Sequence, residues 1–308
     1  MTTDLKNSPV QTETADQMRK ELTVLKERIN SQQDMLERTT GFMSQIQSSL
    51  EQSKQKVEEK NKETFDSMRY AERLQQAILP SCDEVNKAFI DSFIYLRQCE
   101  IIGGDLAYFI EAEDSYFIAA IDCTGHGIPG AMISMMAHSL LDEIIMQHLV
   151  FDPGHILTEL NRMLFSALNG GKKEIKDGLD ISLCRVHKDT KKVSFSGARR
   201  PLLHLSIGAS ELIKATRASI AENPDSTFET IDIEGEGKNK FYMFSDGIPD
   251  QFGGPKGKKF GTKRLVSLIS EIKMLNMKNQ SEIITNTITS WQANEPQIDD
   301  NLIIGFCI

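Results

Sequence analysis

Apolar residues recur with a seven-residue period along the first quarter of the chain. One set occupies every seventh position and a second set fills the intervening spacing of three or four: Leu22, Ile29, Leu36, Met43, Leu50 and Val57, then Met18, Leu25 and Ile46. Between Pro9 and Pro80 there is no proline and a single glycine, Gly41. This pattern is typical of a coiled-coil seam. The sequence therefore predicts a disordered tail over residues 1–10 and a long helix over residues 11–79.

The seam is imperfect, because polar residues fall in the second set and the apolar phase slips further along the helix. The polar positions are Gln32, Thr39, Ser53 and Lys60, and the slip lies near Phe65 and Met68. A helix of this length would extend roughly 100 Å. The alternative is a solitary solvated helix or a disordered segment, but an apolar stripe without a partner does not stabilise a single helix. We therefore expect a coiled coil, as a parallel homodimer.

Beyond residue 80 the apolar residues form short runs typical of strands, separated by longer helical patterns. The strand-like runs span residues 89–96, 115–122, 180–187, 192–197, 228–233, 240–246 and 301–308, and the helical stretches span 130–149, 154–169, 261–275 and 280–292. The strands cluster, and a regular alternation of strand and helix is absent. The pattern predicts an α+β domain over residues 80–308, with a largely antiparallel sheet system and helices packed outside it.

Composition narrows the class of protein. The hydrophobic content of 40% is sufficient for a sizeable core, and the net charge of −9 argues against nucleic acid or an anionic membrane as the main partner. The five cysteines form no CxxC pair, which indicates reduced thiols rather than disulfides or a zinc site. We expect no signal peptide and no membrane span, since no run approaches the roughly 18 apolar residues required. A cytoplasmic protein is the expectation.

Aspartates stand at the tips of several predicted strands. Asp105 follows two glycines, Asp122 ends "SYFIAAID", and Asp246 ends "KFYMFSD". Asp299 and Asp300 directly precede the last strand. A single such residue is more often a strand-end cap or turn. Several strands of one sheet system can nevertheless bring these tips to one edge, where cations must offset the repulsion between carboxylates. Oxygen-only ligands suit Mg²⁺ or Mn²⁺, and two such ions can activate water for attack on a phosphate ester.

Other chemistries fit the sequence less well. The stretch "AAIDCTGHGIPGAMISMM", residues 119–136, lacks the GK[ST] of a phosphate-binding Walker loop and does not match GxGxxG after a first strand. No GxSxG elbow is present. His126 suggests a base that activates a nucleophile, but no partner serine or cysteine is identifiable. Pro129 suits the first turn of a helix that follows.

The segment from about residue 80 to residue 308 resembles the SpoIIE/RsbU-type metal-dependent protein phosphatases, the bacterial branch of the PPM serine/threonine phosphatases. The "DxxGHGxPGA" and "SDGxxDQFGG" blocks are specific for that family, and their order and spacing agree. The matching pieces, in chain order, are "AILPS", "GGDLAYF", "AAIDCTGHGIPGAMISMM", "DGLDISLCRV", "VSFSGARRPLLHL", "FYMFSDGIPDQFGG", "KKFGTKRL" and "QIDDNLIIG".

The resemblance implies two packed antiparallel sheets flanked by helices, with two Mn²⁺ or Mg²⁺ ions at one end of the sandwich. It implies that Asp122 bridges both metals and that the carbonyl of Cys123 supplies a further ligand. Asp105 would serve one metal chiefly through water. Asp246 and Asp299 would complete the other metal's ligands. A metal-bridged hydroxide would attack phosphorus directly, without a covalent phosphoenzyme, so these four aspartates are the expected catalytic residues.

Four features depart from the family or leave a choice open. We prefer Asp299 to the adjacent Asp300 as ligand, because the first acid of the family's pair is the usual one. His126 is displaced from the histidine that directly follows the Asp-Gly pair in the eukaryotic branch, so we expect it to have a structural or supporting role. No arginine matches the phosphate-binding arginine of that branch. Residues 217–229 lack the Ile-Gly pair usual in relatives.

The resemblance also implies a substrate and a mode of control. The substrate would be a phosphoserine or phosphothreonine on a STAS-domain anti-sigma-factor antagonist in a partner switch. We hypothesise that dimerisation through residues 11–79 positions "RYAERLQQAILPS" against the phosphatase and sets its activity, with a regulator that binds the coiled coil. The alternative is an inactive phosphatase-like coiled-coil scaffold that binds a signalling partner. A metal-dependent phosphodiesterase or nucleotidase fits less well.

Overall fold

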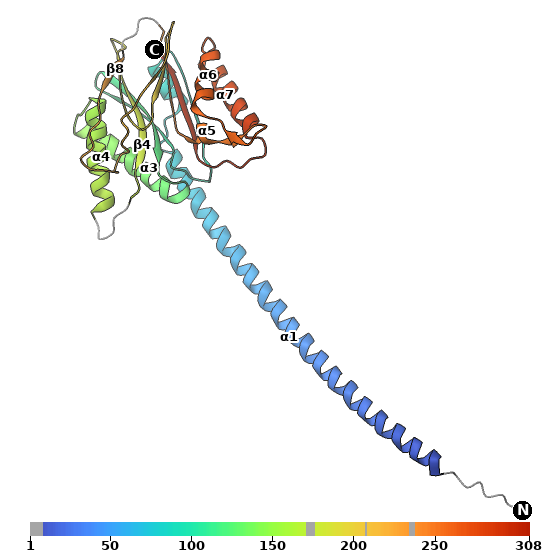
Figure 1. Ribbon diagram of the computed structural model, residues 1–308. Coiled ribbons are helices and arrows are strands. Elements are labelled where there is room, and N and C mark those ends of the chain that lie inside the picture. Colours follow the sequence, from blue (N-terminus) through green and yellow to red (C-terminus); the bar gives the residue numbers. More distant parts are fainter. Residues whose placement is uncertain (1–8, 171–175, 207, 234–237) are drawn as a thin grey trace, which may run out of the picture. The chain divides into compact units, whose positions relative to one another are not determined.

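The computed structural model describes residues 9–170, 176–206, 208–233 and 238–308, with side chains from residue 14 onward (Figure 1). The chain divides into two compact units, Met1–Asp66 and Ser67–Ile308. The predicted tail lies mostly outside the described residues. None of the helices in the described ranges combines the length and apolar character that a membrane crossing requires.

The predicted long helix is present as α1 (Pro9–Gln76). Its heptad residues are exposed: Leu22 is 55% exposed, and Leu36 and Leu50 are each 68% exposed. The absence of interior prolines allows the uninterrupted helix. The pairing of this stripe with a second helix stays a prediction.

Two five-stranded antiparallel sheets form the body of the Ser67–Ile308 unit. The first has the strand order β1 (Asp91–Arg97), β12 (Asn301–Cys307), β9 (Lys240–Phe244), β6 (Leu202–Leu205) and β7 (Ser210–Ile213). The second has the order β2 (Leu106–Ala112), β3 (Ser115–Cys123), β4 (Leu179–His187), β5 (Val193–Ala198) and β8 (Ile231–Ile233). A small hairpin pairs β10 (Phe252–Gly253) with β11 (Lys258–Lys259).

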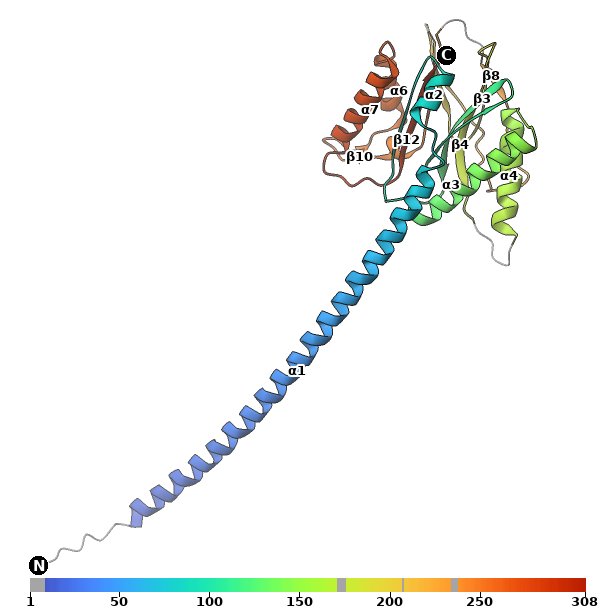
Figure 2. The same ribbon diagram turned by 180° about the vertical axis from the view of Figure 1, so that it is seen from behind.

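Helices cover the outer faces of both sheets (Figures 1 and 2). α3 (Gly127–Asp142), its π-helical continuation η1 (Glu143–Gln147) and α4 (Pro153–Asn169) pack on the β3–β4 sheet, while α6 (Thr262–Glu271) and α7 (Met277–Gln292) pack on the β9–β12 sheet. The two short helices are α2 (Cys82–Ala88) and α5 (Gly247–Asp250). The predicted antiparallel sandwich with flanking helices is therefore confirmed.

Strand β3 shows why its sequence is apolar on both faces. Ile118 and Ala120 point into the core between the sheets, whereas Phe117, Ala119 and Ile121 belong to the core under α3 and α4. This alternation follows the two-residue period of a strand. Because both faces of β3 are covered, its sequence is almost continuously hydrophobic. The polar residue at position 122 stands out at the end of the strand.

Several predicted boundaries were wrong, and short elements were missed. The run 228–233 narrows to β8, the helix over 130–149 becomes π-helical after Asp142, and the one over 261–275 ends at Glu271. The sequence analysis did not predict β2, β6, β7 or α2. α2 begins with a capping box in which Ser81 and Glu84 cap each other's backbone amides, so a signal for it was present.

Residues 217–229, which lack the family's Ile-Gly pair, are held in place by hydrogen bonds with Asn161 of α4. Ala221 has φ +67°, a left-handed conformation that favours glycine. Its amide donates to the Asn161 Oδ1 at 2.7 Å, and Ile220 pairs with Leu179 at the start of β4. Asn161 is fully buried and also donates to the carbonyl of Asn223. The loop is thus held in the conformation that glycine would adopt, at the expense of strain at Ala221.

Candidate metal centre

Acidic residues from both sheets meet at one end of the sandwich. Asp122 lies near the end of β3, and the strand register places it opposite Asp180 of β4. Asp246 follows β9 and begins α5. The amide of Asp246 donates to the Asp122 Oδ2 at 3.2 Å, which joins the two sheets at this point. We call Asp122, Asp180 and Asp246 the acid cluster.

One arginine lies among all three members of the acid cluster. The Nη2 of Arg200 is 2.9 Å from an oxygen of Asp122, 3.0 Å from Asp180 and 2.6 Å from Asp246. Arg200 sits in the short connection between β5 and β6, and its side chain is only 16% exposed. Burial lowers the pKa of this guanidinium, but the three carboxylates outweigh that effect and raise the pKa overall.

Two carboxylates of the cluster, those of Asp122 and Asp180, have raised pKa values. Burial raises the pKa of Asp122 to about 7, against the opposing effect of Arg200. Burial also raises the pKa of Asp180, whose Oδ1 accepts a hydrogen bond of 2.6 Å from the Ser219 hydroxyl. These shifts are expected where several carboxylates share a dry site, and a cation in their midst favours the ionised forms.

Asp105 stands directly before β2 and is 3% exposed. Its Oδ2 is buried without a hydrogen-bond partner among the described residues. Burial raises the pKa of Asp105 well above its usual value, and the negative charge of Asp122 adds to the effect. A buried carboxylate oxygen without a donor is uncommon in folded proteins, and it fits an oxygen that serves a cation.

The adjacent acids Asp299 and Asp300 have different surroundings. Asp300 accepts backbone amide hydrogens from Cys99 at 2.6 Å and Gly104 at 2.7 Å, and a longer one from Asp105 at 3.3 Å. Its carboxylate therefore holds the backbone that carries Asp105. Asp299 is half-buried, and burial raises its pKa, to which the charge of Asp246 contributes. Asp299 is thus electrostatically coupled to the acid cluster, whereas Asp300 serves the backbone.

Glycines allow two backbone segments to touch beside these acids. A Cβ at Gly104 would lie 3.0 Å from the carbonyl oxygen of Cys123 and 2.8 Å from that of Gly125. A Cβ at Gly130, in the first turn of α3, would lie 2.3 Å from the same Gly125 oxygen. The close approach places the carbonyl of Cys123 next to the segment that leads into Asp105. This explains why glycines surround the strand end in this part of the sequence.

His126 lies at the rim of the site. Its Nδ1 is 2.6 Å from the Oε1 of Glu100, and its side chain is 53% exposed. His126 precedes α3 but caps no amide of that helix with its side chain. The supporting role of His126 stays a prediction.

Two members of this site were missed by the sequence analysis. Asp180 carried a usable signal, because antiparallel pairing of "SYFIAAID" with "DISLCRV" puts the two strand-end acids opposite each other. Arg200 lies within the matching piece "VSFSGARRPLLHL", but its contacts with the acids could not be read from the sequence, because the path of this connection depends on both sheets.

The donor set fits a hard divalent cation, although the side chains do not surround one common point. Within the described ranges, no three His, Cys, Asp or Glu side chains form a ready-made metal site. The physical reason is the guanidinium of Arg200, toward which the acid cluster is turned. All available donors are oxygens, and the buried Oδ2 of Asp105 has no other partner. Such oxygens are the ligands that Mg²⁺ and Mn²⁺ prefer.

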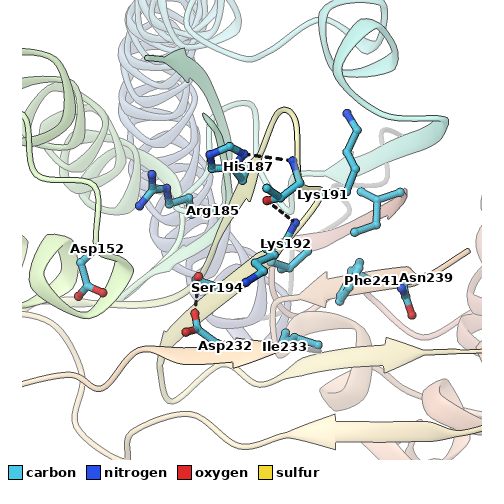
Figure 3. Close-up of a pocket in the computed structure, with 13 residues that line it drawn as sticks. Asp152, Arg185, His187, Lys191, Lys192, Ser194, Asp232, Ile233, Asn239 and Phe241 are labelled. Atoms are coloured by element: carbon cyan, nitrogen blue, oxygen red, sulfur yellow. Dashed lines mark hydrogen bonds between the residues drawn. The ribbon is translucent and has the colours of Figure 1, made fainter. Parts of the chain in front are cut away.

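A separate cavity of about 720 Å³ lies by the hairpin between β4 and β5 (Figure 3). It is lined by Arg185, His187, Lys191 and Lys192 among others. Arg185 and His187 both pair with Asp114, at 3.1 and 3.0 Å. The cavity includes no member of the acid cluster and lies at the opposite end of β4 from Asp180. Despite its volume, this cavity is therefore separate from the acid cluster and is not the candidate catalytic site.

A two-layer antiparallel sandwich with helices outside and acids gathered at one end defines the PP2C class of phosphatase domain. The chain belongs to the SpoIIE family, because the family description Stage II sporulation protein E matches residues 112–307. The phosphoserine phosphatase RsbP of Bacillus subtilis (strain 168) is 26% identical over 163 residues, which cover 52% of this chain and 40% of RsbP. The chain thus spans less than half the length of that curated relative.

Solved structures agree with this assignment. The SiaA-PP2C domain of Pseudomonas aeruginosa superposes with a TM-score of 0.73 at 29% identity, covering 80% of this chain and 98% of that domain. The PP2C phosphatase domain of SpoIIE from Bacillus subtilis, with a fragment of its regulatory domain, gives a TM-score of 0.55 at 16% identity, covering 70% of this chain and 62% of that one. The second likeness concerns the fold alone. The domain is of the protein serine phosphatase type.

Proposed function

We propose that the chain is a metal-dependent serine/threonine phosphatase that hydrolyses a phosphoserine or phosphothreonine on a signalling protein. The observation that carries this proposal is the meeting of acids from both sheets at one end of a SpoIIE-family sandwich. The named activities of its relatives support the reaction class. The alternative, an inactive phosphatase-like scaffold, would have no need for a buried carboxylate such as Asp105.

In this proposal two Mn²⁺ or Mg²⁺ ions are held by Asp105, Asp122, Asp246, Asp299 and the carbonyl of Cys123. The unpartnered Oδ2 of Asp105 supports the assignment. Asp299 is preferred to its neighbour in sequence because the neighbour's oxygens are already taken by backbone amides. When bound, the ions would supply Lewis-acid activation of a water nucleophile and of the phosphoryl group.

The surrounding residues would orient these ligands. Asp300 holds the backbone on either side of Gly104 and so fixes the entry of Asp105 into β2. Thr124 fastens the segment after Asp122 to Gly178, since its amide and its hydroxyl both donate to the Gly178 carbonyl at 2.9 Å. Ligands on rigid supports lose little freedom when a cation binds, which is how a protein tunes a metal site.

The test is a phosphatase assay with a phosphoserine peptide and Mn²⁺, comparing the wild type with Asp246→Asn. We expect the variant to lose activity by about 10³-fold or more, because one carboxylate of the proposed ligand set is removed. His126→Ala is the companion variant, with an expected change of less than about threefold because its side chain is half-exposed at the rim. Equal rates for the wild type and Asp246→Asn would contradict the phosphatase and favour the scaffold.

The proposed substrate is a phosphorylated STAS-domain protein acting in a cytoplasmic partner switch. The likeness to the phosphoserine phosphatase RsbP supports a phosphoserine substrate. The direct measurement is release of phosphate from a purified phospho-STAS protein, compared with an unrelated phosphoserine peptide of the same concentration. A kcat/KM no higher for the STAS protein than for the peptide would remove this substrate class and leave the phosphatase activity intact.

The proposed control runs through the end of α1 in the Ser67–Ile308 unit. Gln75 is 3% exposed, and its Nε2 donates to the carbonyl of Gly103 at 2.7 Å and to the Ser134 hydroxyl at 3.1 Å. Its Oε1 accepts a hydrogen bond of 2.8 Å from Gln98. Gly103 lies two residues before Asp105. A homodimeric coiled coil that sets the end of α1, with or without a regulator bound to it, would thereby act on the proposed metal centre.

Deletion of residues 1–64 tests this control. We expect the shortened chain to be monomeric and to have an altered phosphatase rate, while its folding transition stays cooperative. Sedimentation velocity gives the oligomeric state and the peptide assay gives the rate. A shortened chain that remains a dimer with unchanged activity would exclude the coiled coil from both roles.

A further inference from the structure

We infer that Arg200 is an internal counter-cation of the acid cluster, which competes with the divalent metal for the same carboxylate oxygens. The inference rests on the proposed function, since it concerns the cations that the same acids would hold. It assigns Arg200 a positioning role: it neutralises the carboxylates before the metal arrives and raises the metal concentration needed for loading.

The contacts of Arg200 define this role. A single nitrogen, Nη2, contacts Asp122, Asp180 and Asp246 within 3.0 Å. The oxygens that it contacts on Asp122 and Asp246 belong to the proposed metal ligands. A guanidinium and a divalent cation at the same oxygens would repel each other strongly at this depth. The two cations therefore compete for one cluster, and metal binding must include the cost of moving the guanidinium.

The contacts of the Arg200 side chain would allow its guanidinium to leave the acid cluster. Its Nε is buried without a hydrogen-bond partner among the described residues, so the guanidinium is held along one edge and not by its full fork of donors. The backbone at this position is fixed, because the amide of Arg200 donates to the Ala198 carbonyl at 2.6 Å and Pro201 follows. Movement is therefore confined to the long side chain, whose rotatable bonds allow it to leave the cluster.

The adjacent arginine provides a built-in comparison. Arg199 turns the other way, with its Nη2 3.1 Å from Glu222 and its Nε 3.1 Å from the carbonyl of Arg217. Its side chain is 49% exposed. Two consecutive arginines thus carry equal charge, but only Arg200 contacts the acid cluster. A variant of Arg199 removes the same charge from the same connection without removing a direct contact with the acid cluster, although the charge of Arg199 also lowers the pKa of Asp180.

The experiment is calorimetric titration of the full chain with Mn²⁺ for the wild type, Arg200→Met, Arg200→Lys and Arg199→Met. We expect Arg200→Met to bind Mn²⁺ at least about tenfold more tightly than the wild type, because the competing cation is gone. Its melting temperature without metal should fall, since three carboxylates lose their partner, and Mn²⁺ should restore it. Arg199→Met should bind within about twofold of the wild type.

Arg200→Lys covers the case in which the methionine variant does not fold without metal. The shorter ammonium lacks the planar fork of the guanidinium, so we expect Mn²⁺ binding tighter by about threefold. Unchanged or weaker binding in the Arg200 variants that fold, beside normal binding by the wild type, would overturn the inference alone. No Mn²⁺ binding by any of the four proteins would instead overturn the proposed metal centre.

Discussion

Two regions of the molecule reverse the usual distribution of residues between surface and interior. Along α1 the large apolar side chains face outward, as with Leu36 and Leu50, each 68% exposed. In the Ser67–Ile308 unit carboxylates are buried, as with Asp105 at 3% and Asp300 at 2% exposed. Exposed apolar stripes and buried charges are both costly for a chain by itself. In the proposals above, a second helix would cover the stripe of α1 and a cation would offset the charge of Asp105, whereas backbone amides already bind Asp300.

The buried acids differ among themselves in how their charge is compensated. Backbone amides donate hydrogen bonds to Asp300, whereas the guanidinium of Arg200 contacts the carboxylates of the acid cluster. Asp105 has an oxygen with no donor at all among the described residues. Asp300 thus binds backbone amides, whereas Asp105 has an unpaired oxygen that fits the ligand role proposed above. Neutralising Asp300 and Asp105 in turn is the sharpest test of this difference in charge compensation.

The largest effect on stability is expected for Asp300→Asn. The substitution removes the charge and places an amide group against three backbone donors, so we expect a loss of about 3–5 kcal/mol in the free energy of unfolding. Asp105→Asn should not lower that free energy in the absence of metal, since it removes a buried charge without a hydrogen-bond donor at one oxygen. It should weaken Mn²⁺ binding by about 10- to 100-fold.

Urea denaturation and Mn²⁺ titration of both variants measure these effects. The two acids are matched in burial and differ only in their surroundings, so each variant is the control for the other. If both variants lost stability equally, the distinction between a backbone-binding acid and a ligand acid would be wrong. If Asp105→Asn bound Mn²⁺ as the wild type does, Asp105 would leave the proposed ligand set.

The next effect concerns the exposed stripe of α1. Ile29→Lys combined with Met43→Lys puts two charges into the predicted seam, and we expect the dimer dissociation constant to rise by about 100-fold or more, equivalent to roughly 2.7 kcal/mol. Ser31→Lys combined with Gln45→Lys adds the same charges outside the seam and should leave the constant within about threefold. Sedimentation equilibrium measures both. A wild-type chain that is monomeric at every concentration would contradict the coiled coil.

Sequence patterns were sufficient for the elements that are long and repetitive. The heptads predicted α1, and continuous apolar runs predicted β3, β4 and β12, because burial on two faces leaves an unmistakable composition. Short edge strands such as β7 were missed, since three of its four residues are exposed and its pairing depends on β6. Boundaries within α3 shifted where the helix becomes π-helical, which depends on packing and has no sequence signal here.

The candidate site was predictable only in part, for a related reason. Asp105, Asp122, Asp246 and Asp299 stand at strand tips, and a sandwich brings strand tips together. The choice of these four as ligands came from the family resemblance, since strand-tip position alone does not separate Asp299 from Asp300. Arg200 was out of reach, because its contacts arise from a connection between two strands of different sheets. The division of labour between Asp299 and Asp300 likewise depends on backbone amides that only the folded chain brings into range.

A smaller effect is expected at Gln75, near the end of α1. Gln75 is a polar side chain that is 3% exposed, whereas the residues on either side of it, Leu74 and Gln76, are exposed. Gln75→Ala leaves the carbonyl of Gly103 without this donor, so we expect a loss of about 1–2 kcal/mol in the free energy of unfolding. Gln76→Ala, one residue further and exposed, is the control and should change it by less than about 0.5 kcal/mol. Equal losses in urea denaturation would show that Gln75 is not a structural link.

The smallest expected effect is a gain in stability at Ala221. This residue holds φ +67°, a conformation that costs a residue with a Cβ roughly 1–2 kcal/mol relative to glycine. Ala221→Gly relieves that strain but increases the entropy of the unfolded chain, which offsets about half of the gain. We therefore expect the free energy of unfolding to rise by about 0.5–1 kcal/mol. Ala218→Gly, in the same loop but outside the left-handed region, should lower it slightly, and a loss in both variants would mean that the conformation at Ala221 is unstrained.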